Sequence, residues 1–133
     1  MSNYEQMAID FCNKFGVEFR VTDNFGIVDK WNSKMEKWEV QLVRGSKVWT
    51  FPFYMGLGHN GAEPTAYDVL ASLTKYDVGS LEEFCSEFGY DYLDDETGLI
   101  NKESIKTYKA VIKEYRNVLD MFSDCIDELS EIA

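Results

Sequence analysis

The chain has 133 residues, of which 45% are hydrophobic and 15% aromatic. This length and composition predict one folded domain with a substantial core, and they argue against a largely disordered protein. No run of about 18 apolar residues occurs, so no membrane-spanning segment is expected. The polar N-terminus does not resemble a secretory signal, and the three dispersed cysteines suit a reducing compartment. We therefore expect a cytoplasmic protein.

The charge is strongly negative and unevenly distributed. The chain has 24 acidic and 13 basic residues, a net charge of -11. Residues 1–60 carry seven of each sign, whereas residues 61–133 carry 17 acidic and six basic side chains. Such a chain repels nucleic-acid phosphates on average and is attracted to basic surfaces, including those of nucleic-acid-binding proteins. We expect no direct nucleic-acid binding and no membrane partner, and acidity that serves only solubility is the simpler alternative.

The first predicted element is a helix that ends at Gly16. Ser2 and Glu5 have the spacing of a capping box, and glycine tolerates the left-handed conformation that ends many helices. The apolar face of this helix would comprise Tyr4, Met7, Ala8, Phe11 and Phe15.

Strand-like alternation begins at Val17 and continues to Thr22. A turn at Asp23-Asn24, a short strand over residues 25–31 and a polar loop from Asn32 to Lys37 are expected next.

A hairpin is predicted around Gly45-Ser46, read as a two-residue type II′ turn. The register would pair Arg44 with Lys47, Leu42 with Trp49, Val40 with Phe51, and Trp38 with Phe53. Pro52 cannot donate a ladder hydrogen bond, which predicts an edge strand.

Three helices are expected after the strands. Thr65 and Asp68 cap a helix that would run to about Tyr76, and a capping box at Ser80 opens a short helix that stops at Gly89. A long amphipathic helix would run from about Lys102 to near the end of the chain. Its apolar stripe would comprise Ile105, Tyr108, Ile112, Tyr115, Leu119, Phe122, Ile126 and Leu129, widened by Val111, Val118, Cys125 and Ile132. This stripe predicts a core-facing helix, with a coiled-coil dimer seam as the alternative.

The order of these elements predicts an α+β fold. It comprises an N-terminal helix, a three- or four-stranded antiparallel sheet, two short helices and one long C-terminal helix. We expect a single domain, with a sheet half over about residues 16–55 and a helical half over about residues 64–132.

Gly56-Leu57-Gly58-His59-Asn60-Gly61 has the G-x-G-x-x-G spacing of a dinucleotide-binding loop. Such a loop needs a buried parallel strand before it and a helix that begins at its third glycine. Here a hairpin arm precedes the loop, the next helix cap lies at Thr65, and residues 48–74 contain no Lys or Arg. A structural turn is therefore predicted, and a ligand- or nucleotide-binding module or enzyme that uses His59 is the alternative. We assign no catalytic residue, cofactor or metal.

The candidate partner-binding surface is acidic. It comprises Glu82, Glu83, Glu87, Asp91, Asp94, Asp95, Glu96, Asp120, Asp124, Asp127 and Glu128. The acids of residues 91–96 depart from the spacing of an EF-hand, and those near the end of the last helix oppose its dipole. Such a break with a local rule often marks function. A folded acidic surface can imitate a phosphate backbone and occupy a basic channel.

Three segments resemble a widespread family of small phage and prophage proteins. They are Phe53–Gly56, Pro64–Leu70 and Phe84–Asp91, and the similarity covers roughly residues 38–112. The resemblance implies a phage-encoded protein that acts in a bacterial cytoplasm. By analogy with other small acidic phage proteins, we expect a non-enzymatic inhibitor of a host defence protein, such as a CRISPR effector or a restriction enzyme. The protein would be a monomer or homodimer, and a phage assembly accessory protein is a further alternative.

Overall fold

The computed structural model describes residues 3–57 and 62–132, which form two compact units. Unit 1 comprises residues 1–72 and 124–133, and unit 2 comprises residues 73–123. The capping residue Ser2 and the loop residues Gly58–Gly61, which include His59, lie outside the described residues. By this division, the last short helix (Ile126–Ser130) belongs to unit 1 with the sheet, whereas residues 73–123, which precede it in sequence, belong to unit 2.

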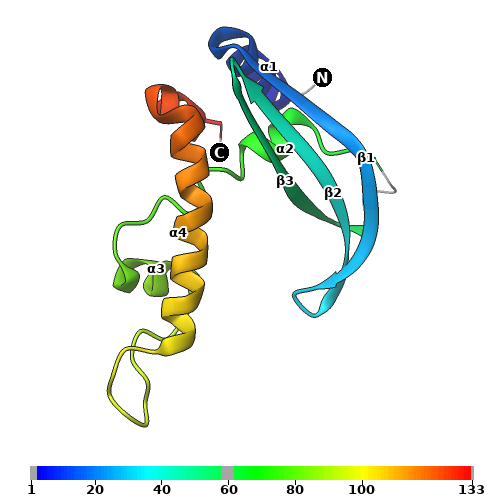
Figure 1. The fold of residues 1–133 in the computed structure, drawn as a ribbon. Helices are drawn as coiled ribbons and strands as arrows, with labels where there is room; N and C mark the ends of the chain where they lie inside the picture. Colours follow the sequence, from blue (N-terminus) through cyan, green and yellow to red (C-terminus); the bar gives the residue numbers. More distant parts are fainter. Residues whose placement is uncertain (1–2, 58–61, 133) are drawn as a thin grey trace. The chain divides into compact units, whose positions relative to one another are not determined.

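The elements confirm the α+β class (Figure 1). In chain order they are α1 (Asn3–Phe15), β1 (Val17–Lys30), β2 (Ser33–Arg44), β3 (Lys47–Gly56), α2 (Ala66–Leu70), α3 (Leu81–Phe88), α4 (Lys102–Phe122), the 3-10 turn η2 (Ser123–Cys125) and α5 (Ile126–Ser130).

Helix α1 ends where the sequence predicts. Gly16 has a φ of +69°, a left-handed conformation that stops the helix. The predicted apolar face is only partly buried. Ala8 and Phe11 are buried, whereas Tyr4 and Met7 are 61% and 40% exposed. Helix α1 packs beside α2 and against β1.

The three strands form one antiparallel sheet in which β2 lies between β1 and β3 (Figure 1). The predicted β2–β3 register is confirmed at each of its four pairs, from Arg44–Lys47 to Trp38–Phe53. Gly45 has a φ of +59° while Ser46 does not have a positive φ, as a type II′ turn requires. Pro52 lies on the edge strand β3, as predicted.

The turn predicted at Asp23-Asn24 is wrong, because β1 continues through it. The pairing with β2 shifts register between Val21 and Phe25, which marks a β-bulge. Asn24 Nδ2 donates to Glu39 Oε2 over 2.7 Å, so a turn-type residue is held inside the sheet by the neighbouring strand.

The loop predicted over Asn32–Lys37 is also wrong. Trp31 and Asn32 have φ values of +54° and +58° and connect β1 directly to β2, which begins at Ser33. Positive φ at both central residues is the geometry of a type I′ hairpin turn. The polar residues from Ser33 to Lys37 therefore form strand instead of loop.

One face of the sheet is apolar. Trp38, Val40 and Leu42 of β2 are buried on this face. Glu36 lies on it too and is only 3% exposed, and its carboxylate accepts a hydrogen bond of 3.0 Å from Trp38 Nε1. The opposite face carries a polar ladder in which Arg20 donates to Gln41 and Gln41 donates to Thr50.

Helix α2 begins with the predicted capping box. The Thr65 hydroxyl accepts from Asp68 N, and the Asp68 carboxylate accepts from Thr65 N. The helix ends at Leu70, earlier than the predicted end near Tyr76, and turns replace its last part.

Helix α4 differs from the predicted long helix in two ways. Its buried face is centred on Val111, Val118 and Phe122, whereas Leu119 of the predicted main stripe is 38% exposed. The helix also ends at Phe122, because Cys125 leaves the helical region with φ -137° and ψ 27° before α5 begins. The predicted continuous helix to the end of the chain is therefore wrong.

Candidate protein-binding surface

The structure gathers seven of the predicted acidic residues in unit 2. They lie on α3 and the loop after it and are Glu82, Glu83, Glu87, Asp91, Asp94, Asp95 and Glu96. Asp120 lies on α4 of the same unit, whereas Asp124, Asp127 and Glu128 belong to unit 1.

Capping residues at both ends set the bounds of helix α3 and so place its carboxylates in the first and last turns. Ser80 Oγ accepts from Glu83 N over 3.2 Å at the start of the helix, and Gly89 ends it with a φ of +74°. Glu82 and Glu83 occupy the first turn, where negative charge is favourable to the helix dipole. Glu87 lies in the last turn, where the same dipole disfavours it, and it is exposed to solvent.

One side of α3 packs into the hydrophobic cluster of unit 2. The cluster consists of Phe84, Cys85 and Val111, surrounded by Tyr76, Val78, Leu81, Phe88, Tyr92 and Tyr108. Tyr108 also donates from its hydroxyl to Gly79 O over 2.8 Å. These contacts fix α3 on α4, so the carboxylates of α3 are presented from a rigid base.

The loop between α3 and α4 contains a small closed hairpin, which we call the acidic hairpin (Tyr92–Asn101). Asn101 N donates to Tyr92 O over 2.9 Å, and Leu93 and Ile100 form a β-bridge. Asp94 Oδ1 accepts from Glu96 N over 2.8 Å and from Thr97 N over 3.2 Å, so this carboxylate holds the turn. Asp95 and Glu96 at the turn remain exposed. Figure 1 shows the loop beyond the N-terminal end of α4.

Two residues that the sequence analysis overlooked fasten the acidic hairpin to α4. Ser104 is 4% exposed, and its hydroxyl donates to Asp91 O over 2.6 Å. Asn101 is the N-cap of α4, and its side chain accepts from Ser104 N over 3.0 Å. The sequence signal for this helix start was an Asn followed three positions later by a Ser, because both residue types favour helix caps.

The acidic hairpin also exposes apolar side chains, which the sequence analysis did not identify as a site. Leu99 is 69% exposed, Leu93 48% and Ile100 43%, and Tyr90 just before the hairpin is 47% exposed. Grouped exposed apolar side chains with a polar rim are typical of a protein-binding surface. Here the exposed apolar side chains lie in or next to a segment that also carries the exposed carboxylates of Asp91, Asp95 and Glu96.

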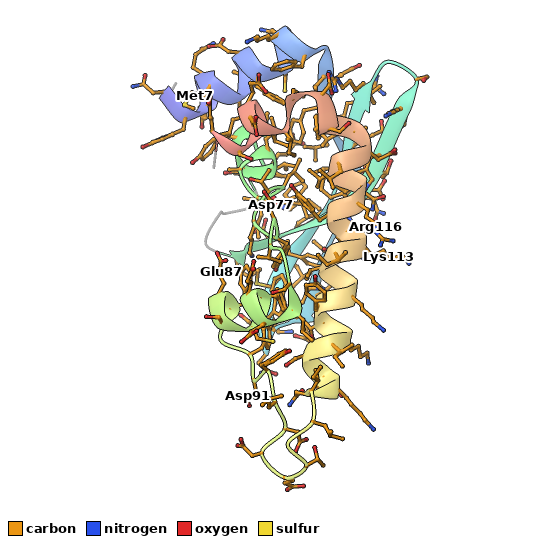
Figure 2. All side chains as sticks on the ribbon, turned by 90° about the vertical axis from the view of Figure 1, so that its left-hand side faces the viewer. Met7, Asp77, Glu87, Asp91, Lys113 and Arg116 are labelled. Carbon is orange, nitrogen blue, oxygen red and sulfur yellow. The ribbon has the colours of Figure 1, made fainter. Side chains whose placement is uncertain are left out.

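A second overlooked feature is a row of cations on α4, which we call the basic stripe. It comprises Lys102, Lys106, Lys109, Lys113 and Arg116, all exposed. Figure 2 shows Lys113 and Arg116 on the side of α4 away from Glu87 and Asp91. The 4-3-4-3 spacing of these cations was readable in the sequence, where only the apolar residues were tested for periodicity. In unit 2, Glu87 and Asp91 therefore lie on the other side of α4 from Lys113 and Arg116.

The acids near the C-terminus have structural roles that the sequence did not indicate. Asp124 accepts from both terminal nitrogens of Arg44, over 2.6 and 2.7 Å, and this contact lowers the pKa of Asp124 to about 2. Asp127 and Glu128 fall in the first turn of α5, so the predicted conflict with a helix dipole is wrong for them. Of the four predicted acids near the C-terminus, only Asp120 lies in the last turn of α4, where its negative charge opposes the helix dipole as predicted.

The structure gives little support for a small-molecule site within the described residues. No group of three His, Cys, Asp or Glu side chains there is arranged to hold a metal. A hollow of about 270 Å³ near the β-bulge is lined by polar and apolar residues of the three strands, among them Asn24, Phe25, Lys37, Glu39 and Phe51. The alternative site at His59 and the glycine loop falls on residues outside the described ranges.

Within residues 3–57 and 62–132, no helix combines the length and apolar character needed to cross a membrane. No protein-family model, curated protein or solved structure matches the chain.

Proposed function

We propose that this protein acts by binding another protein through the acidic side of unit 2. The observation that carries the proposal is a segment without any cation. Residues 76–101 contain eight carboxylates and no Lys, Arg or His, and seven of the eight side chains are exposed. Asp94, which holds the turn of the acidic hairpin, is the partly buried one. The segment is folded on α4, so its charges are presented in a fixed arrangement.

A basic surface with an apolar recess is the partner surface that these residues fit. Rim charges mainly accelerate association and select the partner, whereas apolar side chains that become buried supply most of the affinity. Asp91, Asp95 and Glu96 would supply the charge, and the exposed Leu99 would supply the apolar contact. Basic surfaces of this kind are common on proteins that bind nucleic acids.

The resemblance to phage and prophage proteins narrows the proposal. A phage-encoded protein with this surface would be a non-enzymatic antagonist in the host cytoplasm, and its target would be a nucleic-acid-handling defence protein such as a CRISPR effector or a restriction enzyme. The acidic side would occupy the basic channel in which the target holds its nucleic acid.

The test removes charge where no local structure depends on it. Glu82 and Glu83 favour the start of α3, and Asp94 holds the hairpin turn, so they are kept. The variant combines E87Q, D91N, D95N and E96Q, all at exposed side chains. A matched control removes four exposed charges elsewhere, with D23N, E63Q, E114Q and E131Q.

Both variants and the unmodified protein are compared in affinity capture from a bacterial lysate and in inhibition of a purified CRISPR effector and a purified restriction endonuclease. We expect the acidic-side variant to associate about tenfold more slowly and the control to behave like the unmodified protein. If both variants lose binding equally, the net charge of the protein rather than this surface accounts for the effect. If the unmodified protein captures no host protein and inhibits neither enzyme, the proposal is wrong.

A further inference from the structure

We infer that the basic stripe of α4 is a binding site for duplex DNA, which it contacts through the phosphate backbone. This site is separate from the acidic surface and does not depend on the function proposed for it. The inference starts from the position of the five cations on the helix. Val111 packs in the cluster of unit 2, and Lys109 and Lys113 each lie two residues from it. At about 100° per residue, both lysines point roughly 160° away from the packed side.

The stripe lies on one continuous helix, and the described residues form no ion pair with its cations. The residues from Lys102 to Arg116 lie within one continuous helix and rise about 21 Å along its axis. Among the described residues, none of the five cations forms an ion pair with a carboxylate. The other charged residues of α4 are Glu103, Glu114 and Asp120. Because the cations are not neutralised within the described structure, they are available to an external anion.

The negative net charge of the chain does not cancel this local field. Figure 2 shows Glu87 and Asp91 on the side of α4 away from Lys113 and Arg116, so a helix about 10 Å thick separates these two acids from these two cations. The screening length in 0.1 M salt is also about 10 Å, so a phosphate at the stripe is influenced mainly by the nearby cations.

The chemistry of the stripe favours duplex DNA over a single strand. Proteins that bind single strands combine positive charge with aromatic side chains on which the bases stack. Besides the five cations, the exposed residues of α4 are Glu103, Ala110, Glu114, Asn117, Leu119 and Asp120, so no aromatic platform accompanies the cations. A rigid helix with a row of cations is suited to the regular phosphates that flank the major groove of B-form DNA. Contacts to phosphates carry no direct sequence information, so binding is expected to be independent of sequence.

The test measures fluorescence anisotropy of a labelled DNA duplex of about 20 base pairs, with the same strand alone as a second probe. The variant combines K106Q, K109Q and K113Q, because glutamine keeps helix propensity. The control combines K14Q, K34Q and K37Q, which remove the same charge from unit 1. Circular dichroism verifies that both variants keep their helices.

We expect weak binding of the duplex by the full chain, with a Kd of about 10⁻⁴ to 10⁻⁶ M at physiological salt. The slope of log K against log salt should fall by roughly 2 to 3 in the stripe variant, since each phosphate contact contributes about 0.9. The control should retain the slope. Four results would overturn the inference: no binding at low salt, equal loss in the control, tighter binding of the single strand, or self-association that disappears in the stripe variant.

Discussion

Arg44 and Asp124 join two parts of unit 1 that are 80 residues apart in sequence. The guanidinium donates two hydrogen bonds to the two oxygens of the carboxylate, of 2.6 and 2.7 Å, and Nε donates a third, of 2.9 Å, to Phe15 O. Arg44, the last residue of β2, thereby contacts the end of α1 and the turn before α5. Lysine could not replace it, because a single ammonium cannot reproduce the planar fork.

The pairing predicts loss of stability in acid. The pKa of Asp124 is about 2 in the folded protein, mainly because of the hydrogen bonds from Arg44, and its ordinary value is 3.8. A carboxyl with a lowered pKa stabilises the fold above its unfolded pKa, and the stabilisation is lost as pH falls from about 4 through 2. Urea denaturation at a series of pH values should show that the free energy of unfolding falls less for D124N than for the unmodified protein as pH is lowered from about 4 to 2. Parallel curves for the two proteins would contradict the prediction.

The turn at Trp31-Asn32 predicts a position-specific penalty for branched side chains. Asn32 has a φ of +58°, a conformation that costs most residues about 1–2 kcal/mol. N32V should therefore lower the free energy of unfolding by about 1–2 kcal/mol. Ser33 is already in the extended conformation of β2, so S33V should cost little. Urea denaturation compares the two, and a similar small effect at both positions would argue against the type I′ turn.

The successes and failures of sequence-based prediction in the sheet have a common cause. The Gly45-Ser46 hairpin was predictable because its turn residues and the alternation of its arms indicate the same register. Asp23-Asn24 looked like a turn by residue type, but Glu39 on the adjacent strand binds Asn24 and keeps it in the sheet. At Trp31 no glycine marks the turn. Sequence reasoning therefore failed where the local residue types did not indicate the outcome.

The same distinction applies to the candidate site. The acids of α3 and their helix boundaries follow from Ser80 and Gly89, which are local signals. The role of Asp94 as the acceptor of the hairpin turn depends on backbone geometry that the spacing of acids does not show. The end of α4 was unpredictable because apolar periodicity continues across η2, while the pairing of Asp124 with Arg44 is a tertiary contact.

The hydrogen bond from Ser104 predicts that its removal changes the loop that carries the acidic hairpin. Removing its hydroxyl in S104A would leave Asp91 O without that donor and should destabilise the protein by about 1–2 kcal/mol. Hydrogen exchange should quicken at Asn101, whose amide closes the hairpin. S86A, at an exposed position on α3, is the control and should leave exchange unchanged. Unchanged protection in S104A would show that the hairpin does not depend on this bond.

A substitution of Leu99 distinguishes the apolar contribution to binding from the charge contribution at the proposed protein-binding surface. It is the most exposed apolar residue of the acidic hairpin, so L99S should leave the melting temperature within about a degree of the unmodified protein. Burying this side chain against a partner would contribute affinity, so L99S should raise the dissociation rate about fivefold, equivalent to about 1 kcal/mol. V48S removes an apolar side chain that is 60% exposed on β3, and it should not change the rate. Biolayer interferometry on the captured partner at low and high salt distinguishes the two contributions. If L99S dissociates like the unmodified protein while the acidic-side variant associates slowly, the surface binds by charge alone.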